Sequence, residues 1–504
     1  MNAITSAQMN AIDANCESLG LDSLQLMENA GAAVAQAVRD KIDIGRKNEV
    51  VFIAGRGNNG GDAFVAARHL ASSCNVTINV ILLGRAFQIK TREARHNFDV
   101  LKHSDVGILE VTESTGLLQL EWQWLRNADI IVDAIFGTGI KGKIKEPEST
   151  AIDLINNSGA YIIAVDVPSG FSPDGEPFDR SVRADTTLTF HKMKTGLITP
   201  DAEKYAGDVR VIGIGVCKDA EKYVGTGNIQ TLTRRRTESH KGHSGRVLVI
   251  GGGAYSGAPA LAALAALRTG ADIVTLAVPK SVAGIIASFS PNLIVRPLSS
   301  DVLCPEDVPR ILELIRSHDV VIIGMGLGRD ERTKAAISKI IPHCRKVVVD
   351  ADGFHGITLA PAAGCEMILT PHAGEFAKLR EIDTPSETRA RVEAVMEFSK
   401  QNRIVTLQKG NIDVISDGDS VLLNRTGNPG MTVGGTGDVL AGIVGALFAV
   451  NSAMDAASCG AFINGAAGDL AFVNMGFGLL ATDVIDNITE TMKSGSISNG
   501  QEQR

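Results

Sequence analysis

A glycine-rich segment in the second half of the chain has the composition of a phosphoryl-binding turn. Residues 428–440 read NPGMTVGGTGDVL, and the apolar run at 440–450 predicts a helix directly after them. Glycines at a helix N-terminus leave backbone N–H groups free, and these groups stabilise negative charge on a transferred phosphoryl group. Asp438 would then lie beside the phosphoryl acceptor and take its hydroxyl proton. Asp438 could also be a helix cap, but three glycines in the four preceding residues exceed what a cap requires.

A second glycine-rich segment, in the first half, has the spacing of a dinucleotide-binding turn. The apolar run 50–54 leads into GRGNNGGD at 55–62, which contains GxGxxG between a predicted strand and a predicted helix. A hydride-transferring enzyme of this kind also needs an acidic residue near the end of its second strand to bind the ribose. That strand, predicted at 76–83, is followed by Gly84 and Arg85, which disfavours a dehydrogenase.

A third segment nearly matches the P-loop of nucleotide triphosphatases. Residues 137–144 read GTGIKGKI, with Ile144 where a triphosphatase needs a hydroxyl group to bind magnesium, so we exclude that class. The free amides and two lysines of this turn could still receive a diphosphate. From this motif alone, a glycine turn with solvated lysines is an equally good interpretation.

An aspartate follows another buried strand. In VDVPSG, at 165–170, Asp166 comes directly after the apolar run 161–165. Ligands of open α/β sheets bind at the carboxyl ends of the strands. Asp166 is therefore either a structural turn cap or a partly desolvated carboxylate that transfers protons, and this motif by itself leaves both open.

The elements that must position these residues alternate between short β-branched runs and helical stretches, which predicts α/β domains with parallel sheets. A helix is expected at 21–38, with Asp22 as its cap. The expected strands lie at 50–54, 76–83, 130–135 and 161–167 in the first half, and at 246–250, 273–278, 320–323, 346–349, 367–369 and 404–407 in the second.

A polar stretch separates the two series of strands. Residues 217–246 show no sustained period and contain three consecutive arginines at 234–236, which is typical of a solvated linker. We therefore expect two domains, at 1–225 and 226–504.

Composition narrows the class of ligand. The formal charge of −8 gives no general attraction to nucleic acid or to an anionic membrane, so we expect small-molecule substrates and neither of those partners. The seven cysteines are scattered without a CxxC pair, which indicates neither a zinc nor a redox site. The first residues lack the pattern of a signal peptide, and a cytoplasmic protein is expected.

Four segments of the first half, taken together, resemble the NAD(P)H-hydrate epimerase domain, a Rossmann-like three-layer sandwich. They are LMENAG at 26–31, GRGNNGGD at 55–62, VDAIFGTG at 132–139 and VDVPSG at 165–170, in that order. The resemblance implies that two loops bind the hydrated dinucleotide. These comprise Asn58, Asn59, Gly60, Gly61 and Asp62, and Gly137, Thr138, Gly139, Ile140, Lys141, Gly142 and Lys143, together with Asp166.

The resemblance also implies a potassium ion held near Asn59, Asp133 and Ser169, whose oxygen atoms suit a hard cation. The substrate of that family carries a hydroxyl group on C6 beside the ring nitrogen, so its configuration there is labile. We assign to Asp166 the proton transfer that lets C6 open and re-form on its other face, worth roughly 10² to 10⁴ in rate. Lys192 is a weaker candidate for the same pocket.

The second half resembles the ribokinase-like superfamily, and within it the NAD(P)H-hydrate dehydratase branch. The resemblance rests on GGTGD with GGG at 251–253, GMGLG at 324–328, DAD at 350–352, TPHAGE at 370–375 and KG at 409–410. It implies a site for the hydrated nucleotide at Gly326, His372, Ala373, Gly374, Glu375 and Asp438. It implies an ADP site at Lys409, Gly410, Asn411, Ile412 and Asp413, and at Asn428, Pro429, Gly430, Met431, Thr432, Val433, Gly434, Gly435, Thr436 and Gly437.

The resemblance thus predicts repair of hydrated NADH and NADPH. The first domain would interconvert the R and S hydrates, and the second would dehydrate the S form with ADP as phosphoryl donor, giving NAD(P)H, AMP and phosphate. Magnesium with the diphosphate and a homo-oligomer are also expected. Two alternatives remain: an ATP-dependent ribokinase-like kinase of small molecules fused to a dinucleotide-binding module, and a catalytically silent first domain.

Overall fold

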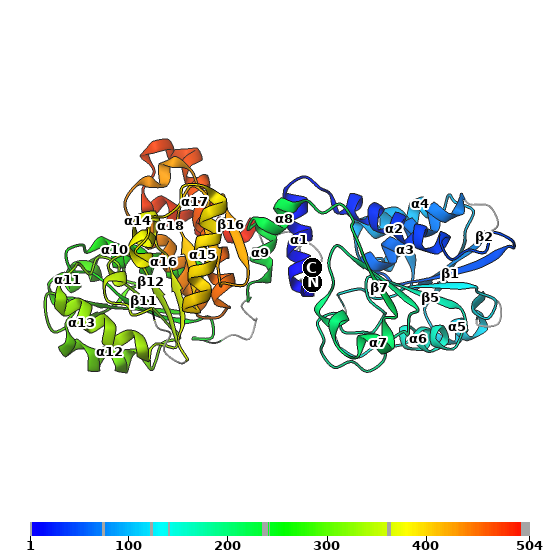
Figure 1. Ribbon diagram of the computed structural model, residues 1–504, viewed down its shortest axis with the longest axis horizontal. Helices are drawn as coiled ribbons and strands as arrows, with labels where there is room; N and C mark the ends of the chain where they lie inside the picture. The colour runs from blue at the N-terminus through cyan, green and yellow to red at the C-terminus, as the bar shows by residue number, and fades with distance from the viewer. Residues whose placement is uncertain are drawn as a thin grey trace. The chain divides into compact units, whose positions relative to one another are not determined.

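The computed structural model describes residues 3–72, 76–120, 124–139, 142–233, 240, 242–359 and 364–494. By its internal contacts the chain divides into two compact units, Met1–Cys217 and Lys218–Arg504. Each unit has one β-sheet with helices against both faces (Figure 1). The predicted fold class, two α/β domains, is confirmed.

The first unit contains a seven-stranded sheet in the order β3-β2-β1-β4-β5-β6-β7, with every neighbouring pair parallel. Its strands are β1 (Asn48–Ala54), β2 (Val76–Leu83), β3 (Gly107–Val111), β4 (Ile130–Ala134), β5 (Tyr161–Val165), β6 (Thr186–Phe190) and β7 (Asp208–Ile212). Its helices are α1 (Ser6–Ser18), α2 (Ser23–Arg39), α3 (Asn58–Ala71), α4 (Arg92–Leu101), α5 (Ser114–Leu120), α6 (Glu148–Asn156) and α7 (Ala202–Tyr205).

Alternate residues of the central strand β1 pack toward opposite faces of the sheet. Val51 and Ile53 join a core with Ile152 and Ile155 of α6, whereas α3 packs on β1 and β2 and is covered in turn by α2 and α4. In Figure 1, α2, α3 and α4 lie on one side of this sheet, and α5, α6 and α7 on the other. The central strands are buried on both faces, which explains their continuous apolar sequences.

The second unit contains a nine-stranded sheet in the order β10-β9-β8-β11-β12-β13-β14-β15-β16, which is parallel as far as β14 and antiparallel from there to β16. The strands are β8 (Arg246–Ile250), β9 (Ile273–Val278), β10 (Ile294–Pro297), β11 (Val320–Ile323), β12 (Lys346–Val349), β13 (Glu366–Leu369), β14 (Val405–Gln408), β15 (Asp413–Ser416) and β16 (Val421–Asn424). The helices are α8 (Lys218–Lys222), α9 (Thr226–Thr231), α10 (Gly257–Thr269), α11 (Lys280–Ser288), α12 (Val308–Ile315), α13 (Glu331–Ile340), α14 (Ala373–Arg380), α15 (Thr388–Asn402), α16 (Thr436–Phe448), α17 (Ala453–Met475) and α18 (Ala481–Ser494).

This sheet also separates two helical layers. Val247 and Val249 of β8 belong to the core formed with α10, α16, α17 and α18. Their neighbours Leu248 and Ile250 belong to a different core, formed with α12, α13 and α15. Successive side chains of a strand point to opposite faces of the sheet, so alternate residues pack against different helical layers.

The predicted strands agree with the central strands of both sheets, but several other strands were missed. Among these, β3, β7 and β10 lie at sheet edges and are only partly buried. An edge strand covered incompletely does not need a continuous apolar sequence, so its pattern is weak. The helix expected at 21–38 is α2, and Asp22 caps it by accepting a hydrogen bond from the Leu24 N–H at 2.9 Å.

The segment expected to be a linker begins with two short helices that pack on the second unit. The Val224 N–H donates to the Leu423 carbonyl of β16 at 2.8 Å, and Asp219 lies 3.0 Å from Arg425. Ile229 and Leu232 are buried in the core beneath α17. Residues 218–225, which we placed with the first domain, therefore lie with the second unit, and the three arginines at 234–236 are outside the described residues.

One helix of the described residues, together with the turn after it (Ala453–Gly478), is long and apolar enough to cross a membrane, but its apolar stretch of 18 residues is 67% buried inside the unit. It packs between α16 and α18, so its composition is that of a core helix.

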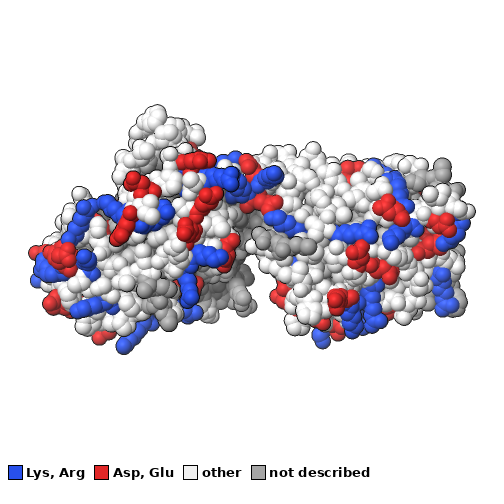
Figure 2. All heavy atoms as spheres, in the orientation of Figure 1, with Lys and Arg blue, Asp and Glu red and all other residues white. Residues whose placement is uncertain are grey.

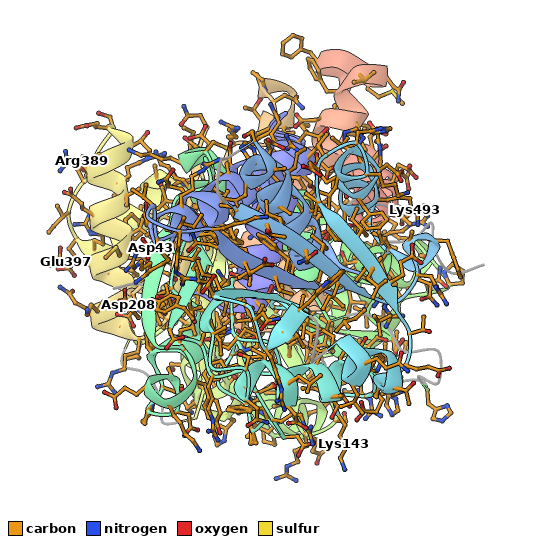
Figure 3. All side chains as sticks on the ribbon, turned by 90° about the vertical axis from the view of Figure 1, so that its right-hand side faces the viewer. Asp43, Lys143, Asp208, Arg389, Glu397 and Lys493 are labelled. Atoms are coloured by element: carbon orange, nitrogen blue, oxygen red, sulfur yellow. The ribbon has the colours of Figure 1, made fainter. Side chains whose placement is uncertain are left out.

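Charged side chains of both signs are interspersed on the face shown in Figure 2. Figure 3 shows Arg389 and Glu397 pointing outward from α15, a helix whose buried residues include Val395 and Phe398. The face of the described residues in Figure 2 therefore carries both positive and negative side chains and is not uniformly basic, in keeping with the formal charge of −8.

We expect fragments 1–217 and 218–504 to fold separately, because each contains a complete sheet and core. A second fragment that begins at residue 236 should unfold at lower urea concentration. It lacks Ile229 and Leu232, whose burial contributes about 1.5–3 kcal/mol each. Ile229→Ala in fragment 218–504 is the matched control and should lose part of the same stability. Equal midpoints for fragments 218–504 and 236–504 would contradict this account.

Candidate active sites

The first site is a cavity of ≈ 790 Å³ at the carboxyl ends of three neighbouring strands. Gly55 follows β1, Ile135 follows β4 and Asp166 follows β5. Eight of the predicted residues line it: Asn58, Asn59, Asp62, Gly137, Thr138, Gly139, Lys143 and Asp166. Met9, Asn10 and Asp13 of α1 also line it, a placement that no motif of the sequence predicted.

Asp166 is held in place by a buried lysine. Lys194 Nζ lies 2.9 Å from Asp166 Oδ1, and the lysine side chain is fully buried. The same ammonium group donates to Thr189 Oγ1 at 3.1 Å and to the Phe190 carbonyl at 2.9 Å. The backbone of Asp166 has φ +66°, a left-handed conformation that is uncommon for a residue with a side chain. This fixed geometry and the paired charge favour a functional carboxylate over a simple turn cap.

Two further carboxyl groups share the cavity. Burial raises the pKa of Asp13 to about 6, and the neighbouring charge of Asp166 adds to the rise while Lys194 opposes it. Burial also raises the pKa of Asp62 well above its ordinary value, with Asp166 and Asp13 adding to the rise. These carboxyl groups therefore differ in their electrostatic surroundings, because only Asp166 has an ammonium partner among the described residues.

Two of the three residues expected to hold potassium are hydrogen-bonded to one another, and the third, Asn59, lies against the neighbouring turn that lines the cavity. Asp133 and Ser169 are fully buried, and Asp133 Oδ2 accepts the Ser169 N–H at 2.7 Å. Ser169 Oγ accepts the Phe136 N–H at 2.9 Å. A Cβ added at Gly137 would lie 3.4 Å from Asn59 Cγ, so the Asn59 amide lies against the same loop, and its Nδ2 has no hydrogen-bond partner among the described residues.

The electrostatics of this group suit a cation. Burial raises the pKa of Asp133 to about 6, although hydrogen bonds from Ser169 oppose the rise. No basic side chain of the described residues pairs with Asp133. The donor set therefore fits a potassium ion. It consists of the buried Asp133 carboxylate without a counter-charge, the Ser169 hydroxyl group, and the Asn59 amide, whose oxygen and nitrogen can exchange places.

The remaining predicted residues of this site are placed differently. Gly60 packs against the backbone of Gly55, and Gly61 packs against Met27, so neither lines the cavity and a side chain at either would clash. Gly142 is exposed with φ +81° and does not line the cavity, whereas Lys143, one of the eight lining residues, is itself exposed at the surface (Figure 3). Ile140 and Lys141 lie outside the described residues. Lys192 does not line the cavity; its carbonyl instead accepts from Lys194 Nζ at 3.3 Å.

The second site lies at the carboxyl ends of β12, β13 and β14. Asp350, Thr370 and Lys409 come directly after these three neighbouring strands. Asp350 Oδ1 accepts a hydrogen bond from Thr370 Oγ1 at 2.8 Å and lies 3.0 Å from Lys409 Nζ. Burial alone would lower the pKa of Lys409, but the charges of Asp350 and of the more distant Glu375 and Asp438 outweigh it and raise that pKa.

Asp438 lies in the first turn of α16, beside this pair. A Cβ added at Gly437 would lie 3.4 Å from Lys409 Nζ, so the absence of a side chain there lets the lysine reach the N-terminus of the helix. Gly435 has φ +99°, which a residue with a side chain adopts only with strain. Burial raises the pKa of Asp438 to about 7, the charge of Asp350 adds to the rise, and Lys409 opposes it.

The segment 370–375 is joined to Lys409 through the backbone. The Lys409 N–H donates to the Pro371 carbonyl at 2.8 Å, and His372 and Lys409 form a parallel bridge. His372 caps α14, its Nδ1 accepting from the Gly374 and Glu375 N–H groups at 3.1 and 3.3 Å. This cap gives His372 a structural role, and Ala373 begins the helix after it. Gly326 has φ +68° and follows β11, the strand next to β12.

The two segments expected to hold ADP combine exposed and anchored residues. The exposed ones are Gly410, Asn411, Pro429, Thr432 and Gly434. Asp413 Oδ1 accepts the Gly410 N–H at 2.9 Å, so Asp413 shapes the first segment from within. Asn428 Nδ2 donates to Asp469 Oδ1 of α17 at 2.9 Å, which anchors the second segment.

The other residues of the second ADP segment, 430–436, are mostly anchored to the protein. Gly430 is buried against Phe472, and Met431 packs against Gly468. Thr436 Oγ1 donates to the Met431 carbonyl at 2.9 Å and lies 3.2 Å from the Val433 carbonyl, which closes the turn before α16. Ile412 is partly buried, and its carbonyl accepts a hydrogen bond from Arg391 at 2.7 Å.

Sequence reasoning missed four residues that these sites use: Asp13, Lys194, Asp350 and Asp469. Asp350 had the same signal as Asp166, an acid directly after an apolar strand, but was read only as part of a motif. Asp13 and Asp469 lie within helices and carry no such local signal.

Comparisons with known proteins match both halves of the chain. The family model described as NAD(P)H-hydrate dehydratase matches residues 247–490, and the one described as YjeF-related protein N-terminus matches residues 23–196. The protein of Archaeoglobus fulgidus named bifunctional NAD(P)H-hydrate repair enzyme Nnr is 42% identical over 98% of this chain and 99% of its own length. A protein of the same name from Pyrobaculum aerophilum is 42% identical over 98% of each chain.

Among solved structures, the ADP/ATP-dependent NAD(P)H-hydrate dehydratase from Bacillus subtilis, co-crystallised with ATP and Mg²⁺, is 26% identical to this chain. It covers 54% of this chain and 98% of its own, with a TM-score of 0.48. The dehydratase family model agrees with the expected ribokinase-like fold of the second unit.

The raised pKa of Asp438 predicts the pH dependence of nucleotide-dependent turnover at the second site. A base must be deprotonated, so kcat/KM should rise as the pH increases through about 7, the pKa of this carboxyl group. Asp350→Asn removes the neighbouring negative charge and should move this rise to lower pH. Initial rates between pH 5.5 and 8.5 at saturating nucleotide measure both profiles. If kcat/KM of Asp350→Asn rose over the same pH range as that of the wild type, the group that titrates in this range would not be Asp438.

Proposed function

The chain belongs to the family of bifunctional NAD(P)H-hydrate repair enzymes, and we propose from this that it epimerises hydrated NADH and NADPH in its first unit and dehydrates them in its second. The observation that carries the proposal is the presence in one chain of two strand-end sites, each with an aspartate paired with a lysine. The match over 98% of the chain favours this function over a kinase fused to a binding module.

For the first unit, we propose that the hydrate enters the cavity with its nicotinamide ring at Asp166. The amides of the 137–139 turn and the N-terminus of α3 face the same cavity and suit the diphosphate. C6 of the hydrated ring carries both a hydroxyl group and the ring nitrogen. Asp166, held by Lys194, is the group that exchanges a proton with this carbon's substituents while its configuration is lost and regained.

For the second unit, we propose phosphorylation followed by elimination. Asp438 takes the proton of the C6 hydroxyl group, whose oxygen then receives the β-phosphoryl group of ADP. Phosphate is a much better leaving group than hydroxide, so the ring nitrogen expels it, and loss of a proton from the ring gives NAD(P)H. AMP and phosphate are the other products.

Within this scheme, the first turn of α16 and Lys409 stabilise the transferred group. The backbone N–H groups at 435–437 lie at the positive end of the helix. Lys409 lies against Gly437 and brings its positive charge to the same point. We propose that magnesium enters bound to the diphosphate, where it neutralises charge, because the described residues contain no group of three His, Cys, Asp or Glu side chains that could hold a metal ion.

We propose that potassium is held by Asp133, Ser169 and Asn59 and orders the 135–139 turn beside the substrate. Its chemical contribution is a fixed positive charge behind the diphosphate-binding loop. The cytoplasmic location and homo-oligomeric state expected from the sequence stay predictions.

We expect the two aspartates to separate the two reactions. Asp438→Asn should yield neither NADH nor AMP from either hydrate and still interconvert them, because the first site is intact. Asp166→Asn should give a two-phase recovery of NADH absorbance with ADP: a fast phase for the S hydrate and a slow one limited by spontaneous epimerisation. A single fast phase to completion in Asp166→Asn would remove its assigned role, and wild-type repair by Asp438→Asn would remove the proposed base.

We also expect epimerisation to depend on potassium. Exchange of potassium for tetramethylammonium, which is too large for the site, should slow conversion of the R to the S hydrate, measured by chromatography without nucleotide. Asp133→Asn should lose this dependence, because the buried negative charge is gone. Thermal unfolding of fragment 1–217 should shift upward with potassium in the wild type only. Equal rates in both salts would contradict the assigned ion.

A further inference from the structure

The proposed function leaves one cavity residue without a role, namely Asp13 of α1. This helix has Met9, Asn10 and Asp13 on the side that lines the cavity. Ile12 and Cys16 lie next to these residues around the helix, one turn from Met9 and Asp13, and are buried in the unit. Asp13 is half-buried, and within the described residues its carboxyl group makes no hydrogen bond or ion pair. A carboxyl group in an enzyme cavity without a protein partner is available to a ligand.

The backbone that positions Asp13 also positions Lys194. Ile4 forms a parallel bridge with Lys194, its N–H donating to the Met193 carbonyl at 2.9 Å. In return its carbonyl accepts the Thr195 N–H at 3.1 Å. Thr5 then caps α1, and the Ser6 N–H donates to Asp174 at 2.8 Å. Because α1 starts from this bridge, Asp13 is fixed relative to the Lys194–Asp166 ion pair.

The cavity therefore contains two carboxyl groups in different electrostatic surroundings. Asp166 is paired with the buried ammonium group of Lys194 at 2.9 Å. Asp13 has no such partner, and its pKa is raised to about 6, first by burial and then by the charge of Asp166. Neighbouring carboxyl groups whose environments separate their protonation states are the usual sign of an acid and a base in one site.

We propose that Asp13 is the general acid of epimerisation and acts beside Asp166 as the base, so that the bond that opens is the one between C6 and the ring nitrogen. This inference rests on the proposed epimerase activity and names its second catalytic residue. It also selects between the two bonds at C6 whose opening would erase the configuration.

The step balances with these two groups alone. Asp166 takes the proton of the C6 hydroxyl group, and the oxygen forms a carbonyl with C6. The bond between C6 and the nitrogen breaks, its electron pair goes to the nitrogen, and Asp13 protonates that nitrogen. Rotation about the bond between C5 and C6 presents the other face of the aldehyde, and the reverse transfers close the ring and restore both carboxyl groups.

The geometry of the substrate matches that of the two residues. The hydroxyl group and the ring nitrogen are bonded to the same carbon, so an acid and a base that act on them must be neighbours. Opening of the other bond would place the departing and returning water on opposite faces of the ring. Asp13 and Asp166, which interact electrostatically in one cavity, fit the first arrangement.

Other charged groups face the same cavity and are compared in the experiment. Asp62 is the nearest alternative acid, because it is buried there and interacts with both Asp13 and Asp166. The remaining charged residues that line the cavity are Arg56, Lys90, Lys143, Lys145, Glu146, Glu148 and Lys194.

The experiment uses the full chain without nucleotide, so that only epimerisation proceeds from the R hydrate of NADH. Asp13→Asn should lower kcat at least 10²-fold with KM changed less than threefold, and Asp13→Glu should recover part of the loss. Glu17→Gln, an exposed carboxylate on the same helix, is the matched control and should behave as the wild type. An unchanged KM shows that the cavity of Asp13→Asn is still folded.

Two results would overturn the proposal. One is an Asp13→Asn variant with wild-type kcat, especially if Asp62→Asn loses activity instead. The other comes from the reaction in H₂¹⁸O, where opening at nitrogen keeps the original oxygen in the S hydrate, whereas incorporation of one ¹⁸O per epimerisation shows opening at oxygen. Failure of the proposed function is distinct, because the wild type itself would then not accelerate epimerisation and Asp166→Asn would have no effect.

Discussion

Both sites depend on a lysine ammonium group that lies among aspartates at the ends of parallel strands. Lys194 pairs with Asp166 in the first unit, and Lys409 pairs with Asp350 in the second. An isolated charge is costly to bury, so each lysine and its aspartate stabilise one another where neither would be stable alone. A second carboxyl group near each pair, Asp13 or Asp438, forms no ion pair within the part of the chain that the structure describes, and burial raises its pKa.

This arrangement follows from the parallel sheets. Parallel strands in sequence are joined by crossover helices, so their carboxyl ends meet at one edge of the sheet and the residues after them become neighbours. In the second unit, Asp350, Thr370 and Lys409 follow three adjacent strands although they are far apart in sequence. Short hydrogen bonds to Thr370 and Lys409 leave Asp350 little freedom, and the field it creates at Asp438 is therefore fixed.

Glycines let backbone and charge approach each other at both sites, but by different means. Gly137 lets the Asn59 amide lie against the turn after β4, and Gly437 lets Lys409 reach the first turn of α16. Gly60 and Gly61 instead permit close packing of α3 beneath the cavity. A glycine-rich motif therefore combines ligand-facing and packing positions, and only the neighbouring elements show which is which.

The sequence by itself determined the fold class, the central strands and most of the strand-end residues, because a buried parallel strand needs a continuous apolar run and the residue after it lies at the ligand-binding edge. Asp166 could be selected on this basis and Asp438 from the glycine-rich start of a helix, whereas Asp133 came only from the resemblance, which also supplied the expected roles. It could not indicate the edge strands β3, β7 and β10, whose partial exposure leaves no clear pattern. Nor could it indicate Asp13 or Lys194, because their place in the cavity depends on a bridge between residues 4 and 194. Only the tertiary structure decides such contacts, since the charge of a carboxyl group depends on which distant residues lie beside it, and a local pattern carries no record of them.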